Sequence, residues 1–117
     1  MLYARTYVAN STIQNAGNGL FAKERIHRGQ TVADYTDTRP ITYAQFRRLM
    51  DANTSTHVAR IGLQYYDGRG FIAGYINRPA KNSKANARML QSGRIVAVRS
   101  IPAGQEIFMG YGPKYHL

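Results

Sequence analysis

Short apolar and β-branched runs, separated by glycine- and asparagine-rich turns, dominate the pattern of hydrophobic and polar positions along this chain. The pattern predicts strands at 3–10, 20–22, 31–35, 57–63, 71–72, 89–91 and 94–99, with a last strand after Gly104. Ser92-Gly93 is a two-residue hairpin signal between two of these strands. The polar stretch 73–87 has no clear period, which predicts irregular structure.

A helical period appears from Thr42 to about Met50. Thr42 and Gln45 have the spacing of a capping box, and Pro40 is expected to end the preceding strand. The apolar residues of this segment then share one face: Tyr43, Phe46, Leu49 and Met50. Many short strands, one helix and long loops predict a mostly β domain.

Length and composition bound the organisation of the chain. A chain of 117 residues suffices for one domain with a real core, here 1–117, and is too short for two. The absence of cysteine excludes disulfides, a thiol nucleophile and a cysteine-based zinc site. Neither a long apolar run nor the apolar core of a signal peptide is present, so we expect no membrane span and an intracellular protein.

The chain is strongly basic. Its 16 Lys and Arg residues against 6 Asp and Glu residues give a formal net charge of +10. Such an excess favours an anionic partner, whether nucleic acid, chromatin or a membrane surface. The charges are spread along the chain, so a solvated basic surface is the alternative interpretation.

Three polar features are candidates for chemistry. Gly17-Asn18-Gly19 lets backbone amides approach a ligand, but the third glycine and following helix of a dinucleotide fingerprint are missing. Asn77, after an aromatic-aliphatic pair, either binds a polar ligand or closes a turn. The three histidines lie far apart without metal-ligand spacing, so we expect no metal site.

Tyrosine is unusually frequent, with nine residues and no tryptophan. Tyr111 stands between Gly110 and Gly112, where the backbone can be approached closely on both sides. Tyrosines of the second half of the chain either pack in the core and its rim or surround a cation such as a lysine side chain or a sulfonium. These tyrosines are Tyr65, Tyr66, Tyr75, Tyr111 and Tyr115.

One short segment is echoed inside the chain. The segment 26–30, Ile-His-Arg-Gly-Gln, is similar to the segment 101–105, Ile-Pro-Ala-Gly-Gln. Each is followed by an apolar residue and later by a tyrosine. A single pair is no solenoid, and the echo predicts two similar turn-strand units or is a chance similarity.

In order along the chain, these pieces resemble the SET domain of protein-lysine methyltransferases. The glycine-rich segment of that family, followed by an aliphatic residue, Phe and Ala, is similar to 17–22, and its next turn and strand to 29–35. Its central motif, aromatic-Ile-Asn-His-Ser and then Asn-Ala, resembles 75–79 with 86–88. Its closing Gly-Glu-Glu-Leu or Ile with Tyr-Gly resembles 104–107 with 111–112.

The resemblance implies a fold of several small, curved β-sheets around a C-terminal pseudoknot, with one short helix. It implies S-adenosylmethionine as cofactor, held by Gly17, Asn18, Gly19, Leu20, His57, Asn77 and Arg78. Tyr111 matches the catalytic tyrosine. Tyr65, Tyr66, Tyr75, Met109 and Tyr115 are the expected substrate channel, in which Met109 occupies the position that tunes the degree of methylation.

The chain also departs from the family pattern. Arg78 and Pro79 replace His and Ser, and Gly110 replaces a frequent Asp. The leading prediction is a protein-lysine methyltransferase acting on a histone or another chromatin protein, in the nucleus or a host nucleus. The alternative is a weak or inactive SET-like domain that binds chromatin or nucleic acid, and a third is a basic β-rich RNA binder with stacking tyrosines.

The implied substrate raises a charge problem, because a histone tail is itself basic. Nucleosomal DNA can offset the repulsion through its phosphates, so we expect nucleosomes to be better substrates than isolated tail peptides. An acidic non-histone substrate is the other solution. We expect no membrane partner. The substrate channel would be completed either by the chain's own C-terminus, with Tyr115 as the candidate residue, or by a second subunit in a homodimer.

Overall fold

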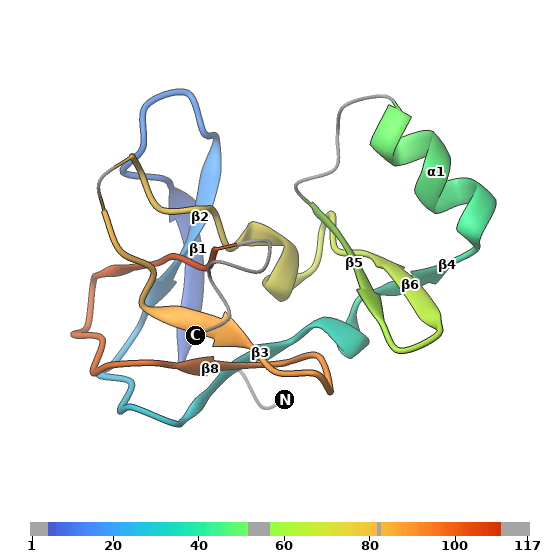
Figure 1. Cartoon of the computed structure of the whole chain (residues 1–117). Coiled ribbons are helices and arrows are strands. Elements are labelled where there is room, and N and C mark those ends of the chain that lie inside the picture. The colour runs from blue at the N-terminus through green and yellow to red at the C-terminus, as the bar shows by residue number, and fades with distance from the viewer. Residues whose placement is uncertain (1–4, 52–56, 82, 111–117) are drawn as a thin grey trace.

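The computed structural model describes residues 5–51, 57–81 and 83–110. In these ranges the chain forms three small antiparallel sheets of three strands each, one α-helix and short 3-10 turns (Figure 1). No helix among the described residues is long and apolar enough to cross a membrane. This is the mostly β architecture with a short helix that the sequence predicts.

The first sheet joins the two ends of the described chain. Its order is β1-β2-β9, from strands β1 (Thr6–Asn10), β2 (Asn18–Ala22) and β9 (Glu106–Ile107). β2 lies in the middle and is almost wholly buried, whereas the edge strand β1 is half exposed. The other edge strand, β9, is buried as well, with Glu106 2% and Ile107 0% exposed, so β1 is the exposed edge of this sheet.

The second sheet has the order β3-β8-β7, from β3 (Thr31–Asp34), β8 (Arg94–Ala97) and β7 (Ala87–Met89). The hairpin between β7 and β8 turns at Ser92-Gly93, where Gly93 has a φ of +93°. The predicted hairpin is therefore confirmed, but its turn is longer than two residues, because Leu90 and Arg94 pair across residues 91–93 through the bond from the N–H of Leu90 to the carbonyl of Arg94.

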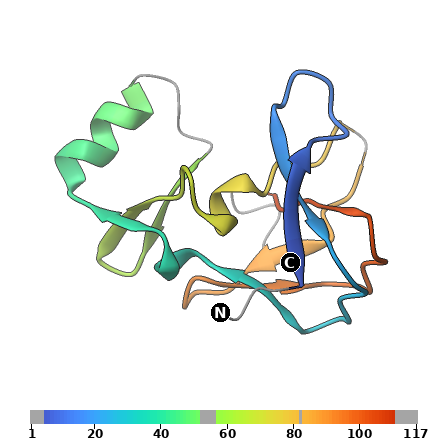
Figure 2. The ribbon, with the colours of Figure 1, turned by 180° about the vertical axis from the view of Figure 1, so that it is seen from behind.

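The third sheet and the helix α1 (Tyr43–Asp51) form a separate lobe beside the other two sheets, as both views show (Figure 2). The sheet has the order β4-β6-β5, from β4 (Arg39–Ile41), β6 (Gln64–Asp67) and β5 (Val58–Ile61). No residue of α1 is fully buried. The helix rests on the sheet mainly through Phe46, whose ring lies 4.4 Å from that of Tyr65 between centroids.

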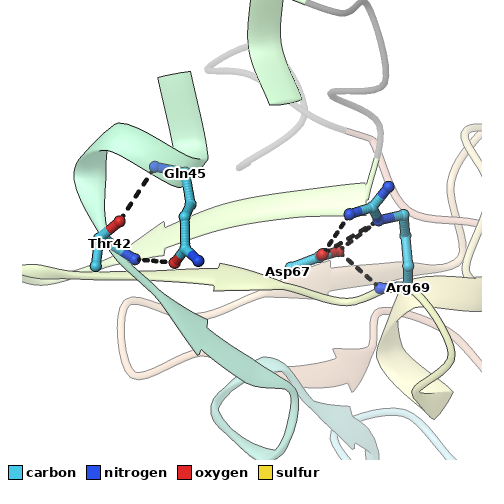
Figure 3. A network of polar contacts seen from close by, with 4 residues as sticks. All are labelled: Thr42, Gln45, Asp67 and Arg69. Atoms are coloured by element: carbon cyan, nitrogen blue, oxygen red, sulfur yellow. Dashed lines mark hydrogen bonds and ion pairs between the residues drawn. The ribbon is translucent and has the colours of Figure 1, made fainter. Parts of the chain in front are cut away.

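The helix begins with the predicted capping box. The backbone N–H of Gln45 donates to Thr42 Oγ1 over 3.1 Å, and the N–H of Thr42 donates to Gln45 Oε1 over 2.9 Å (Figure 3). Both donors would otherwise lack a partner at the helix start.

A single hydrophobic core connects the first two sheets. It is made of buried residues from six of the nine strands, together with residues of two 3-10 turns, η1 (Tyr35–Asp37) and η3 (Ile72–Tyr75). Burial of each such side chain contributes roughly 1.5–3 kcal/mol. The largest fully buried side chains are Tyr35, Leu20, Ile26, Ile76, Ile95, Ile101, Ile107, Met109 and Val32.

The two echoed segments lie side by side in this core. Ile26 and Ile101 form an antiparallel bridge and exchange two backbone hydrogen bonds of 2.9 and 2.8 Å. The glycine of each segment, Gly29 and Gly104, has a positive φ. The echo therefore corresponds to two turns of similar backbone form that pair with each other.

The C-terminal strand β9 leads into a segment that passes between two others. Phe108 forms a parallel bridge with Asn77, and Met109 forms a parallel bridge with Ala87. The backbone N–H of Met109 donates to the carbonyl of Asn77 over 3.0 Å, and that of Ala87 to the carbonyl of Phe108 over 3.1 Å. This threading is the arrangement expected of the predicted pseudoknot.

Three local predictions are wrong. Pro40 lies inside β4, which is an edge strand and tolerates a residue without an N–H. The predicted strand 57–63 ends at Ile61, because Gly62 and Leu63 form the turn of a hairpin and Leu63 is 93% exposed. The predicted strand 71–72 is instead the start of η3.

Candidate functional site

A cleft lies between the turn after β1 and the segment that follows η3. It consists of a cavity of about 350 Å³ and an adjoining one of about 260 Å³, and Ala16 and His57 line both. The first is also lined by Ile13, Ile76, Asn77, Arg78, Pro79 and Ala80, and the second by Asn18, Arg69, Gly70, Gly74 and Tyr75. Four residues predicted to bind the cofactor, Asn18, His57, Asn77 and Arg78, therefore line one cleft.

Asn77 is held in place from several directions. Its Nδ2 donates to the carbonyl of Asn18 over 3.0 Å and to Glu106 Oε2 over 3.3 Å. Its own carbonyl accepts from the N–H of Met109. Because both amide hydrogens are used inside the protein, the oxygen Oδ1 is the polar atom that Asn77 offers to a ligand.

Glu106 connects this site to the rest of the fold. It is only 2% exposed, yet its two carboxylate oxygens accept four hydrogen bonds. Apart from Asn77, the donors are the Ser11 hydroxyl at 2.8 Å and the N–H and hydroxyl of Thr12 at 2.7 and 2.6 Å. A buried carboxylate is stable only with such partners, and Glu106 thereby ties the turn after β1 to Asn77.

The close approach of these groups requires glycine at position 19. A Cβ built on Gly19 would lie 2.9 Å from Glu106 Cδ and 3.3 Å from Asn77 Nδ2. Gly17, in contrast, has a φ of +74° and open space at the Cβ position. The Gly-Asn-Gly segment therefore combines a tight contact inside the protein with an accessible backbone beside the cleft.

His57 contributes an imidazole that is oriented by the backbone. Its Nδ1 lies 2.8 Å from the carbonyl oxygen of Gly74. A carbonyl oxygen only accepts, so Nδ1 carries the hydrogen in this bond. In the neutral ring this leaves Nε2 as an acceptor.

Asn86 clamps the threading segment next to the site. Its Nδ2 donates to the carbonyl of Glu106 over 3.0 Å, and its Oδ1 accepts from the N–H of Phe108 over 2.8 Å. Asn86 is 4% exposed, so both polar ends of a buried amide are satisfied.

The predicted channel residues are not gathered in one place. Tyr75 lines the cleft, whereas Tyr66 packs against the core and Tyr65 against α1. Met109 is 1% exposed and belongs to the hydrophobic core. The predicted catalytic Tyr111 and the channel residue Tyr115 lie outside the described residues.

Leu20 is fully buried in the core, so its side chain supports the site from below the surface. The sequence prediction did not include Ile13, Ala16 or Arg69, which also line the cleft. Ala16 directly precedes the Gly17-Asn18-Gly19 segment, so its position next to that motif could have predicted it as a lining residue. Arg69 follows β6 in the lobe of α1 and the third sheet, and no motif near it in the sequence indicated that it lines the cleft.

No group of three or more His, Cys, Asp or Glu side chains among the described residues could hold a metal ion. The polar groups of the cleft are instead amides, an imidazole and arginines, which suit an organic ligand that carries both donors and acceptors.

We compared the chain with models of known protein families to identify the class to which this fold and cleft belong. The family model of the SET domain matches residues 17–112. The chain belongs to the SET domain family. No curated protein matches the chain.

Solved structures show the same fold. An autoinhibited polycomb repressive complex 2 bound to S-adenosylmethionine contains a chain with a TM-score of 0.73 and 24% identity, covering 94% of this chain and 15% of that one. A structure of an active polycomb repressive complex 2 in the basal state has a TM-score of 0.73 and 24% identity, covering 92% and 15%. The complex of Chaetomium thermophilum gives a TM-score of 0.72 and 24% identity, covering 94% and 15%.

This chain spans about 15% of the length of these solved chains. The predicted family and the predicted fold class are both confirmed.

Proposed function

We propose that this protein is an S-adenosylmethionine-dependent protein-lysine methyltransferase. The observation that carries the proposal is the threading of the segment after β9 past Asn77. The same Asn77 that pairs with Phe108 and Met109 also lines the cleft with Asn18 and His57. The segment 108–109 is therefore fixed against a residue in the wall of the cleft.

The cleft residues fit the chemistry of the cofactor. S-adenosylmethionine, when bound, supplies an electrophilic methyl group on a sulfonium. Its carboxylate suits the guanidinium of Arg78 and the exposed amides near Gly17, and its ammonium suits the free oxygen Oδ1 of Asn77. His57 Nε2 offers a further acceptor in the place where both cavities meet.

The chain's own residues would prepare the lysine. Its amine must lose a proton before it attacks, and a dry, aromatic surrounding lowers the pKa of an amine by desolvation. Tyr75 is half-buried at the cleft, and Tyr111 is our candidate for the hydroxyl that aligns the methyl through weak CH···O contacts. Such a transfer needs no strong base, which agrees with a cleft lined by amides and arginines.

The proposed substrate is a lysine of a protein, with a chromatin protein as the specific candidate and a nuclear location as its consequence. The structural likeness to polycomb repressive complex 2 supports this choice. A second candidate function is a SET-like binding module with little activity. It is favoured by Arg78 and Pro79, which line the cleft where the family has His and Ser.

The first prediction tests the reaction. Tyr111→Phe should lower methyl transfer from labelled S-adenosylmethionine by at least about tenfold, because one aligning group worth roughly 1.4 kcal/mol or more is lost. Binding should remain, seen as an unchanged thermal stabilisation by the cofactor.

Histones, nucleosomes and a mixed lysate serve as acceptors in this assay. Full activity of Tyr111→Phe would remove Tyr111 from the reaction. Thermal stabilisation of the wild type without transfer to any acceptor would instead favour the binding module.

A further inference from the structure

A separate cavity lies in the lobe formed by α1 and the third sheet. Its volume is about 610 Å³, within the range of ligand pockets. The lining combines three arginines and one aspartate with two aliphatic side chains and an amide: Arg39, Arg48, Arg69, Asp67, Ile41, Leu49 and Gln45. Figure 3 shows how Gln45 at the start of α1 and the pair Asp67–Arg69 belong to this lobe.

Asp67 neutralises one of these arginines. Arg69 Nε and Nη2 both bond its carboxylate, the shortest contact being 2.7 Å, and the backbone N–H of Arg69 donates to it as well. The hydrogen bonds from Arg69 lower the pKa of Asp67, so the carboxylate stays ionised at neutral pH. Asp67 and Arg69 therefore form a fixed wall of the cavity with no net charge.

The charges of Arg39 and Arg48 are less fully compensated than that of Arg69, although Asp67 also attracts Arg39 at longer range. Among the described residues, neither lies within ion-pair distance of a carboxylate. Arg39 Cζ lies over the ring of Phe71, 5.9 Å from its centroid. A guanidinium in this contact still has N–H donors for an acceptor. Arg48 approaches from the last turn of α1. The cavity thus presents two arginines that can share one anion.

The remaining lining decides between two kinds of anion. A single-stranded nucleic acid is held by bases stacked on aromatic rings, and no aromatic side chain lines this cavity among the described residues. Ile41 and Leu49 supply aliphatic surface instead. A carboxylate on a short aliphatic stem fits this combination, which is the chemistry of a glutamate or aspartate side chain.

Arg69 connects this cavity to the cleft, because it lines both. We propose that the cavity between α1 and the third sheet binds an acidic side chain of the protein substrate, in the sequence around the lysine that enters the cleft. This inference rests on the proposed function and adds the class of sequence that surrounds the lysine.

The site removes the conflict between a chain of net charge +10 and its substrate. A lysine surrounded by basic residues would be repelled, whereas an acidic neighbour is drawn to Arg39 and Arg48. The inference thereby selects an acidic segment as the local recognition element.

The test uses the full chain and a set of neutral peptides with one central lysine, in which a single glutamate is moved one position at a time away from it. The same peptides with glutamine serve as the reference. At the preferred position, glutamate should lower KM about five- to tenfold relative to glutamine with little change in kcat, because a charge-assisted hydrogen bond is gained in binding. Arg39→Gln and Arg48→Gln should each remove most of this advantage.

Arg47→Gln is the matched control. Arg47 lies on the same helix and is equally a surface arginine, but it lies over Tyr43 and does not line the cavity. Methylation without any glutamate preference, or an equal effect of Arg47→Gln and Arg48→Gln, would overturn the inference and leave the proposed function standing.

Fluorescence anisotropy of a labelled glutamate peptide measures peptide binding independently of methyl transfer. If no peptide is methylated, the proposed function fails, and weaker peptide binding by Arg48→Gln than by Arg47→Gln still supports the acidic subsite. Equal peptide binding by the two variants overturns it. A loss of affinity for an oligothymidine strand in Arg39→Gln and Arg48→Gln, with peptide binding unchanged, also overturns it in favour of nucleic acid.

Discussion

Glu106 places a carboxylate where hydrogen bonds from the turn after β1 and from Asn77 converge. Glu106→Gln keeps the shape of the side chain but replaces one carboxylate oxygen with an N–H₂ group. That group then faces a donor that cannot accept a hydrogen bond, either the Thr12 N–H or Asn77 Nδ2. We expect the free energy of unfolding to fall by about 1–3 kcal/mol, as for an unsatisfied buried polar group, measured by urea denaturation.

Glu24→Gln is the control for this change. Glu24 is exposed and lies 3.8 Å from Arg5, so its loss should be close to neutral. An equal loss in the two variants would contradict the role of Glu106. Cofactor affinity should fall in Glu106→Gln as well, because Asn77 loses one of the bonds that orient its amide.

At the residue scale, the sequence identified the groups with a motif and missed those that act through space. Asn18, Asn77 and Arg78 were predicted from ordered motifs, and His57 from the family resemblance without a motif of its own. All four line one cleft. Arg69 was missed, because only the pairing of β6 with β4 and β5 brings its turn to the cleft. Tyr65 matched a compositional argument about aromatic channels, yet its ring is engaged by Phe46.

The helix α1 depends on its N-terminal cap more than a buried helix would, because none of its residues is fully buried. Thr42→Ala removes the acceptor for the N–H of Gln45 and should lower helix stability by about 1 kcal/mol. Hydrogen exchange of the α1 amides should accelerate, with the core strands β2 and β8 unaffected.

Thr42→Ser retains the hydroxyl and should keep the protection of α1. Uniform acceleration across the whole chain in Thr42→Ala would show that α1 does not open separately from the core. Protection unchanged in both variants would show that packing on Tyr65, rather than the cap, holds the helix.

The end of β6 carries the ionic contact of this lobe. The Arg69 guanidinium lowers the pKa of Asp67 in the folded protein. As the pH falls, Asp67 of the unfolded chain therefore takes up a proton at a higher pH than Asp67 of the folded chain. The stabilisation by this pair is fully present above the ordinary Asp pKa of 3.8 and is lost as the pH falls through the lower pKa of the folded state. Because Arg69 is half exposed, the contribution is at most about 1 kcal/mol.

Asp67→Asn tests this linkage. The difference in unfolding free energy between wild type and Asp67→Asn should be largest near neutral pH and shrink below pH 3.8. Arg69→Gln should weaken the pH dependence of that difference, because the largest contribution to the lowered pKa of Asp67 is lost while those of the residue 69 N–H and of Arg39 remain. A difference that stays constant down to pH of about 2 would contradict the contribution of the pair.

At the element scale, local signals were sufficient wherever the residues that decide the structure are neighbours in the chain. The capping box at Thr42 and the hairpin at Gly93 are such cases. The edge strand containing Pro40 depends on which of its sides faces another strand, and that is a property of sheet order. Likewise, η3 replaces a predicted strand because Gly74 packs against Gly68 from the preceding turn, a contact that no local pattern reveals.

On the scale of the whole molecule, the two lobes divide recognition between them. Figure 1 shows the lobe of α1 and the third sheet beside the two core sheets. The core sheets and the threading segment hold the cleft, the lobe holds the acidic-side-chain cavity, and Arg69 lines both cavities. The net charge of +10 acts on a longer range than either site. It raises the local concentration of any polyanion, independent of the sequence around the lysine.

The long-range attraction by the net charge and the short-range contacts in the cavity should depend differently on salt, and nucleosomes allow the two to be compared. Phosphates of nucleosomal DNA should attract the basic surface, so nucleosomes should be methylated faster than an isolated tail peptide at low salt, and the preference should fall steeply as salt rises. The glutamate preference of short peptides depends on contacts inside one cavity, so it should fall less over the same range. Rates measured on both substrates across a salt series distinguish the two effects.

Arg48→Gln sharpens the comparison. Removing one of 16 basic residues should change the salt dependence on nucleosomes only slightly, while it removes most of the glutamate preference. Equal rates on nucleosomes and tail peptides at low salt would mean that the general basicity of the surface does not recruit chromatin. The acidic-side-chain cavity would then be the element that reconciles so basic a chain with a protein substrate.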